Sequence, residues 1–277
     1  MQLSLAVPGD TGRLRDARSL ADSILFRAPA LHDAPILGAW LAALTGRADM
    51  AGRFMRQEKA TRELGVPAVL ASTAGALLMY SAMGGPIDSL ASLERGVSAA
   101  LDLPSLRRQR DAARLTWLAR PATLAFATYR FPSLRSLAGL GNPLLDAQAA
   151  LVAGDSSHVR NRLEYIREAR RQAFPWNLTV DALCPEGELL VALGDWKGAA
   201  LWLNPTLDVL PQVAPLTLAQ PVRVASLVRA MALRARVAKK LGRDDEARRW
   251  ARATVLLWSD ADPFLRQMVD ELRRLAT

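Results

Sequence analysis

A glycine turn with fixed spacing is the feature that most constrains this chain, and it is clearest in residues 189–211, LLVALGDWKGAALWLNPTLDVLP. Gly194 can take the left-handed conformation that ends a helix, and Asp195 can cap the next helix by accepting a backbone N–H. Small residues flank this turn, with Gly187 seven positions before Gly194 and Ala199 five positions after it. Because small side chains let two helices approach closely, the segment predicts a tightly packed helical hairpin.

The same spacing recurs along the chain, which indicates internal repetition. The equivalent triplets are Ala39, Gly46 and Ala51, then Ala147, Gly154 and Val159, and then Ala235, Gly242 and Ala247. Gly85 fits less closely, with Leu78 and Leu90 at these positions, and Gly12 is followed by Ala17. Gly85 and Gly154 are 69 residues apart, about two periods of the repeat, which predicts one weakly marked unit between them.

This pattern resembles the tetratricopeptide repeat family. The resemblance rests on the spacing around the glycine, on Trp196 after the turn, and on Pro29 and Pro211 at the ends of second helices; residues 179–211 and 220–258 match best. It implies an all-α fold, a right-handed α-α superhelix of about six helix-turn-helix repeats that binds proteins. The aromatic residue that the family carries early in its first helix is mostly missing, so no binding residue is transferred.

A second resemblance concerns residues 229–263, RAMALRARVAKKLGRDDEARRWARATVLLWSDADP. This run is similar to the repeat tails of some large bacterial signalling proteins, including serine/threonine kinases. The chain carries no kinase motif, so the resemblance implies shared ancestry at most.

The repeats predict one helical-repeat domain over residues 1–277, irregular or kinked at 103–140, where prolines break the pattern. Residues 259–277 predict a capping helix, whose inward residues are Phe264, Met268, Val269, Leu272 and Leu275. Residues 10–29 are typical of the second helix of a hairpin, but too few residues precede them to form the first. The N-terminal end is therefore expected to be uncapped and to bind an acidic or apolar protein partner or a second copy of the chain.

The chain is strongly basic, with a formal net charge of +9 and a pI of about 10.6. Such a charge favours acidic proteins, anionic lipid or nucleic acid as partners. Arginine outnumbers lysine by 32 to 4, however, and GC-rich coding alone produces such a bias. In that case the surface is diffusely basic and carries no dedicated anion site. Two groups of arginines share helix faces and are the candidate partner-binding residues: Arg107, Arg110 and Arg114, and Arg160, Arg167 and Arg171. Nucleic acid is disfavoured because no exposed aromatics are interleaved with them.

No catalytic, cofactor or metal site is predicted. Asp155, Ser156 and His158 lie too close on one helix start to form a nucleophilic triad, and capping by Asp155 or Ser156 explains them better. The sequence contains only one other histidine, which argues against a histidine-based metal site. The four tryptophans that could line a ligand cage are expected to be packing residues instead: Trp117, Trp176, Trp202 and Trp258.

An uncharged stretch at residues 64–87 raises the question of a membrane span. Prolines and glycines limit its helical part to Ala68–Met83, about 24 Å long and short of the roughly 30 Å hydrocarbon core. A buried first helix is the better interpretation. No signal peptide is visible at the N-terminus, and the lone Cys184 excludes an internal disulfide. These features favour a soluble, cytoplasmic protein, with peripheral membrane association left open.

The sequence as a whole predicts a non-enzymatic protein-binding scaffold, or a structural subunit of a larger complex, with membrane association of that complex left open. The alternative is a regulatory or sensor module derived from a larger bacterial signalling protein. Neither hypothesis identifies the partner.

Overall fold

The computed structural model describes residues 11–27, 35–62, 68–85, 88–92, 95, 143–172, 180–209 and 221–277. Helices account for all regular structure in these ranges, which confirms the all-α fold class. The irregular region predicted at 103–140 lies outside the described residues, as do Arg107, Arg110, Arg114, Trp117 and Trp176.

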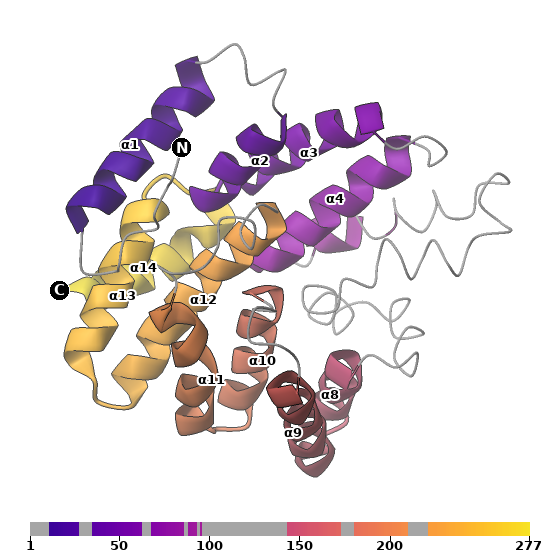
Figure 1. The fold of residues 1–277 in the computed structure, drawn as a ribbon, viewed down its shortest axis with the longest axis vertical. Coiled ribbons are helices and arrows are strands. Elements are labelled where there is room, and N and C mark those ends of the chain that lie inside the picture. The colour runs from indigo at the N-terminus through magenta and orange to yellow at the C-terminus, as the bar shows by residue number, and fades with distance from the viewer. Residues whose placement is uncertain are drawn as a thin grey trace, which may run out of the picture.

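Figure 1 shows how these helices are arranged. In chain order they are α1 (Thr11–Arg27), α2 (Pro35–Leu44), α3 (Ala48–Arg62), α4 (Ala68–Met83), α8 (Pro143–Val152), α9 (Ser156–Gln172), α10 (Val180–Ala192), α11 (Trp196–Asp208), α12 (Pro221–Lys240), α13 (Asp244–Leu257), the 3-10 helix η6 (Pro263–Leu265) and α14 (Arg266–Ala276). The expected helical part of the uncharged stretch is α4, with the bounds predicted from its prolines and glycines. No helix in the described ranges is both long and apolar enough to cross a membrane.

Five glycines with positive φ, between 74° and 77°, form the turns: Gly46, Gly84, Gly154, Gly194 and Gly242. Each turn repeats one hydrogen-bond pattern, in which the glycine N–H donates to the carbonyl three residues back and the next N–H to the carbonyl five residues before it. This is the Schellman pattern that ends helices. Two expectations need correction: Gly84 rather than Gly85 is the turn glycine, and Gly12 lies inside α1.

The small residues on either side of these turns are buried, as the spacing predicted. Those seven positions before and five positions after the four regular turns are Ala39, Ala51, Ala147, Val159, Gly187, Ala199, Ala235 and Ala247. At Gly187 an added Cβ would lie 2.8 Å from the side chain of Leu233, so the close approach of α10 to α12 depends on this glycine.

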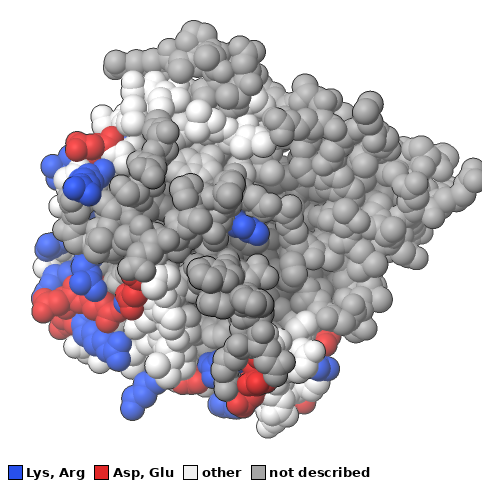
Figure 2. Space-filling model, in the orientation of Figure 1, with Lys and Arg blue, Asp and Glu red and all other residues white. Residues whose placement is uncertain are grey.

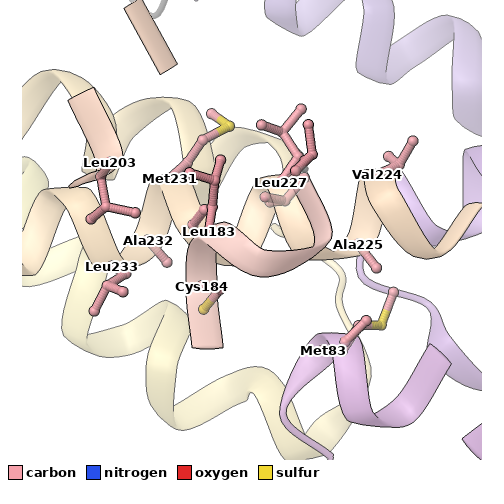
Figure 3. Close-up of a cluster of buried hydrophobic side chains, with 14 of the residues drawn as sticks. Met83, Leu183, Cys184, Leu203, Val224, Ala225, Leu227, Met231, Ala232 and Leu233 are labelled. Atoms are coloured by element: carbon pink, nitrogen blue, oxygen red, sulfur yellow. The ribbon is translucent and has the colours of Figure 1, made fainter. Parts of the chain in front are cut away.

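Helix α12 is the centre of the molecule. From Pro221 to Ala238 only Arg223 and Arg236 are not fully buried, and the helix packs against α10, α11, α13 and α14, its neighbours in sequence. Leu227 and Met231 of α12 meet Leu183 and Leu203 of the preceding hairpin in an apolar cluster (Figure 3). These successive contacts are typical of stacked helical hairpins.

The N-terminal helices pack on this same centre from the other side. Helices α2 and α4 contact α12, and α1 contacts α13, although they are far apart in sequence (Figure 1). At the junction the turn at Gly46 meets Trp258 and Ala261, and Asp262 accepts a hydrogen bond from the backbone N–H of Asp49 at 3.0 Å. Asp262 therefore caps the start of α3 from the C-terminal region.

The C-terminal segment forms a helix as expected. Val269 and Leu272 are buried, whereas Phe264, Met268 and Leu275 are half-buried and pack against the core. The ring of Phe264 stacks on Tyr80 of α4 with centroids 5.6 Å apart. Helix α14 thus covers α13, and η6 contacts α4 through Phe264.

Candidate partner-binding groove

Helix α1 has one face built to pack and one left open. Its packing face is Leu14, Arg18 and Ala21, spaced by four and three residues and all nearly inaccessible. Arg18 hydrogen-bonds the carbonyl of Leu257 at the end of α13 and forms 2.9 Å ion pairs with Asp22 and Asp260. A cation at a helix C-terminus offsets the partial negative charge of the unpaired carbonyls. The expectation of an uncapped N-terminal end is therefore revised, because α13 covers this face of α1.

A groove of about 560 Å³ runs between α1 and the end of α13. Its lining residues are Arg15, Arg18, Ser19, Asp22, Ser23, Phe26, Leu256 and Ser259. Six of these residues are polar or charged, Phe26 and Leu256 are apolar, and the groove is open to solvent. Such a mixed surface suits the side of an amphipathic segment better than a small enclosed ligand.

The charges of the groove are held in fixed positions. Asp22 lies between two guanidiniums, 2.9 Å from Arg18 and 2.6 Å from Arg47. Burial raises the pKa of Asp22, but the hydrogen bonds from Arg47 and Arg18 outweigh it, so the pKa lies below the ordinary 3.8. Arg15, at the exposed edge, makes no ion pair within the described part of the chain. One positive charge is therefore left for an external anion.

Exposed apolar side chains are frequent on the two N-terminal helices, and one of them, Phe26, lines the groove. Seven large hydrophobic residues are exposed in the described ranges, and four of them, Leu20, Phe26, Ile36 and Leu37, lie on α1 and α2. Phe26 is 63% exposed, and the guanidinium of Arg47 lies 4.9 Å from its ring centroid. Because a large exposed aromatic ring in a groove is typical of interaction sites, Phe26 favours a partner surface between α1 and α13.

The predicted basic face on α9 is only partly realised. Arg160 is exposed, but Arg167 is half-buried with its guanidinium 5.8 Å from the ring centroid of Trp202. Arg171 lies in α9, and its side chain is outside the described residues. Arg167 therefore contributes to packing between hairpins, as expected for Trp202. Helix α9 lies at the opposite end of the molecule from α1 (Figure 1).

Charges of both signs are interleaved on the face shown in Figure 2. Many of the arginines there and elsewhere have carboxylate partners, among them Arg236 with Glu271, Arg248 with Asp245 and Arg273 with Asp270. The net charge of +9 does not gather into one positive field on the described part of this face. Of the two interpretations, diffuse basicity fits this surface better than a dedicated polyanion site.

The other candidates for chemistry have structural roles. Asp155 accepts a hydrogen bond from the backbone N–H of His158 at 2.9 Å, which confirms it as a helix cap. Burial, together with the neighbouring Glu188, raises the pKa of the Cys184 thiol well above its ordinary 9.0, so the thiolate nucleophile is disfavoured. The described residues contain no group of three potential metal ligands. Trp258 is fully buried, as expected for a packing residue.

Arg229 forms a second buried charged contact, between α12, α10 and α4. It donates to the carboxylate of Glu188 at 2.6 Å and to the carbonyl of Ser81 at 3.1 Å. Burial lowers the pKa of Arg229, but the adjacent carboxylate outweighs burial and the pKa is raised. The guanidinium stays charged and links three helices.

Sequence reasoning missed the groove because its two walls are about 240 residues apart. One local signal was present, since Arg18 lies on the same face of its helix as Leu14 and Ala21. A lone arginine on an apolar stripe indicates a buried ionic contact, although it does not identify the other wall.

Comparison with known proteins adds no family. No protein-family model, curated protein or solved structure matches the chain.

Proposed function

We propose that this protein is a non-enzymatic scaffold that binds an acidic, amphipathic segment of a protein partner in the groove between α1 and α13. The observation that carries the proposal is a groove whose lining combines Phe26, which is 63% exposed, with Arg15, a cation that lacks an ion pair within the described residues.

The chemistry of the groove defines the partner. Phe26 and Leu256 offer an apolar surface at the rim, while Arg15 offers a charge-assisted contact to a carboxylate. Arg18 and Arg47 are already neutralised by Asp22 and Asp260. We therefore expect one acidic residue of the partner to pair with Arg15 while apolar residues cover Phe26.

We further propose that the hairpins derive from an array of tetratricopeptide-like repeats, now divergent in sequence, in a right-handed superhelix. The five identical glycine turns and the contacts that link α10, α11, α12 and α13 in succession support this origin. A rigid array would present the groove without ordering it on binding, which lowers the entropic cost of association.

Site-specific crosslinking in extracts of the native host tests the proposal. A photo-crosslinking amino acid is placed at Ser23, an exposed residue of the groove, or at Leu201, which is 76% exposed on α11. We expect one partner to be captured from Ser23, with an acidic, amphipathic peptide at the crosslink, and Arg15→Glu to remove most of this product. Equal capture from Ser23 and Leu201, or capture that Arg15→Glu leaves unchanged, would overturn the proposal.

A further inference from the structure

A second hollow lies on the other side of the residues that follow α13. Its volume is about 300 Å³, and its lining residues are Trp258, Ser259, Asp260, Ala261, Arg266, Val269 and Arg273. It is formed because the chain turns sharply after Leu257 and α14 returns beside that turn. Unlike the α1–α13 groove, its walls belong to one continuous segment of the chain.

Two arginines of α14 define the chemistry of this hollow. Arg266 and Arg273 are seven residues apart and so lie on one face of the helix, with Val269 between them. Their Cα atoms are about 10 Å apart along the helix axis, a distance that two long side chains can close around a ligand. Both arginines therefore line the hollow from one face of α14, with Val269 between them.

The balance of charge favours an anion. Asp260 lines the hollow but is already engaged by Arg18 at 2.9 Å and by the hydroxyl of Ser259 at 3.1 Å. Arg273 is paired with Asp270 at 2.6 Å and also donates to the carbonyl of Ser259 at 3.4 Å. Arg266 makes no ion pair with a described residue, so its charge is in excess.

Trp258 closes the hollow on the side of the core, because it lines the hollow and is itself fully buried. The charged groups that can reach a ligand are therefore those of Asp260, Arg266 and Arg273.

We infer that this hollow binds a phosphate group. A planar carboxylate is matched by a single guanidinium, whereas a tetrahedral phosphate can accept from guanidiniums on two sides at once. The volume leaves room for a small organic substituent on the phosphate. The ligand is a free phosphate compound or the phosphate of a lipid headgroup, and the inference does not depend on the proposed partner groove.

Titration calorimetry with inorganic phosphate and with glycerol 3-phosphate, at constant ionic strength in chloride, tests the free compounds. Co-sedimentation with vesicles of phosphatidic acid, against vesicles of phosphatidylcholine, tests the headgroup. Arg266→Gln is compared with Arg274→Gln, which alters another exposed arginine of α14 that does not line the hollow. Circular dichroism and thermal unfolding establish that both variants are folded.

We expect binding in at least one arm, weakened about tenfold by Arg266→Gln and less than about twofold by Arg274→Gln. Binding in the calorimetric arm identifies a free phosphate compound, and binding to vesicles alone identifies a lipid headgroup. The inference is overturned if neither arm shows binding, or if both variants weaken it equally, since equal loss reflects only the net charge of α14.

Discussion

The C-terminal hairpins and the N-terminal helices are attached to the same central helix in different ways. Helices α10, α11 and α13 reach α12 from neighbouring positions in the sequence. Helices α2 and α4 reach it from more than 130 residues away, and α1 reaches α13 across more than 210 residues. The first set of contacts joins successive hairpins. The second set, which we call closure, joins the N-terminal helices to the C-terminal hairpins.

Buried arginines mark both kinds of contact. Arg234 of α12 pairs with Glu246 of α13 at 2.9 Å and with Asp208 of α11 at 2.8 Å, and it lies 4.4 Å from the ring centroid of Trp250. These partners all belong to its own hairpin or to the preceding one. Arg18 instead pairs with Asp260, 242 residues away in the sequence. A contact between distant segments carries a larger loop-closure entropy than one between neighbours. We therefore expect the N-terminal helices to detach before the C-terminal hairpins unfold.

The sharpest way to separate closure from hairpin formation is to compare two turn glycines. Gly46 and Gly242 have nearly the same φ, 76° and 74°, so alanine adds the same backbone strain at both, about 1 kcal/mol. An added Cβ at Gly46 would also lie 2.6 Å from the Cβ of Ala261, whereas at Gly242 it would meet nothing within 4 Å. Overpacking of this kind lowers the free energy of unfolding by about 1–3 kcal/mol more.

We expect Gly46→Ala to lower the free energy of unfolding by about 3 kcal/mol and Gly242→Ala by about 1 kcal/mol. Urea unfolding followed by circular dichroism measures both. Equal losses in the two variants would show that the junction at Gly46 contributes nothing beyond its turn, and the distinction between the two regions would fail.

Arg229 tests the contact of α4 with the centre. Arg229→Met leaves the carboxylate of Glu188 without its guanidinium and the carbonyl of Ser81 without its donor. Removing one member of a buried ion pair is strongly destabilising, and because Glu188 is a quarter exposed we expect a loss of about 3 kcal/mol. The double variant Arg229→Met with Glu188→Met should recover more than half of this loss in the same urea measurement. A double variant as unstable as the single one would mean that packing, rather than the charge, explains the effect.

The sequence predicts the hairpins well because their determinants are local. Each turn is defined by features that lie within a few residues of its glycine. These are the positive φ of the glycine, the backbone hydrogen bond from the next residue to the carbonyl five residues before it, and the small residue five positions after the glycine. Spacing alone could therefore identify Gly46, Gly154, Gly194 and Gly242. Gly12 has the spacing without the conformation, since it lies in the first turn of α1. Spacing alone does not distinguish a glycine that ends a helix from one that starts it.

Closure could not be predicted, because it depends on pairs such as Asp262 with Asp49 and Arg18 with Asp260 that no periodicity connects. For the same reason, local arginine density directed attention to α9, while the groove is formed by α1 and α13. The guanidinium of Arg167 lies 5.8 Å from the ring centroid of Trp202, a contact that arginine density does not predict.

Arg18 provides a smaller test of the N-terminal attachment. Arg18→Met removes the hydrogen bond to the carbonyl of Leu257 and the ion pairs to Asp22 and Asp260, and we expect a loss of about 2 kcal/mol. Hydrogen exchange should show faster exchange in α1 and α2 while α10, α12 and α13 keep their protection. Arg15→Met, on the exposed side of the same helix, is the matched control and should leave exchange unchanged. Uniformly faster exchange across all helices would indicate a single cooperative unit instead of two.

Two aspartates at the junction give the smallest effect, and they act in opposite directions with pH. The pKa of Asp22 lies below the ordinary 3.8, because Arg47 and Arg18 outweigh burial, so its contribution to stability is present above about pH 4 and is lost as the pH falls further. The pKa of Asp262 lies above 3.8, because burial outweighs the hydrogen bonds from the backbone of Asp49 and Ala48. The folded chain therefore holds the Asp262 proton more tightly than the unfolded chain, and stability falls as the pH rises from 3.8 through this pKa.

Substitution by asparagine separates the two, because asparagine keeps an acceptor oxygen but does not titrate. We expect Asp22→Asn to lower stability at pH 7 and to lose less than the parent when acidified below pH 4. Asp262→Asn should retain the cap on α3 and flatten the decline in stability above pH 4. Unfolding temperatures measured from pH 3 to 7 compare the variants with the parent. If both variants change the pH profile in the same direction, the two carboxylates have similar environments. The prediction that the pKa values of Asp22 and Asp262 are shifted in opposite directions would then be wrong.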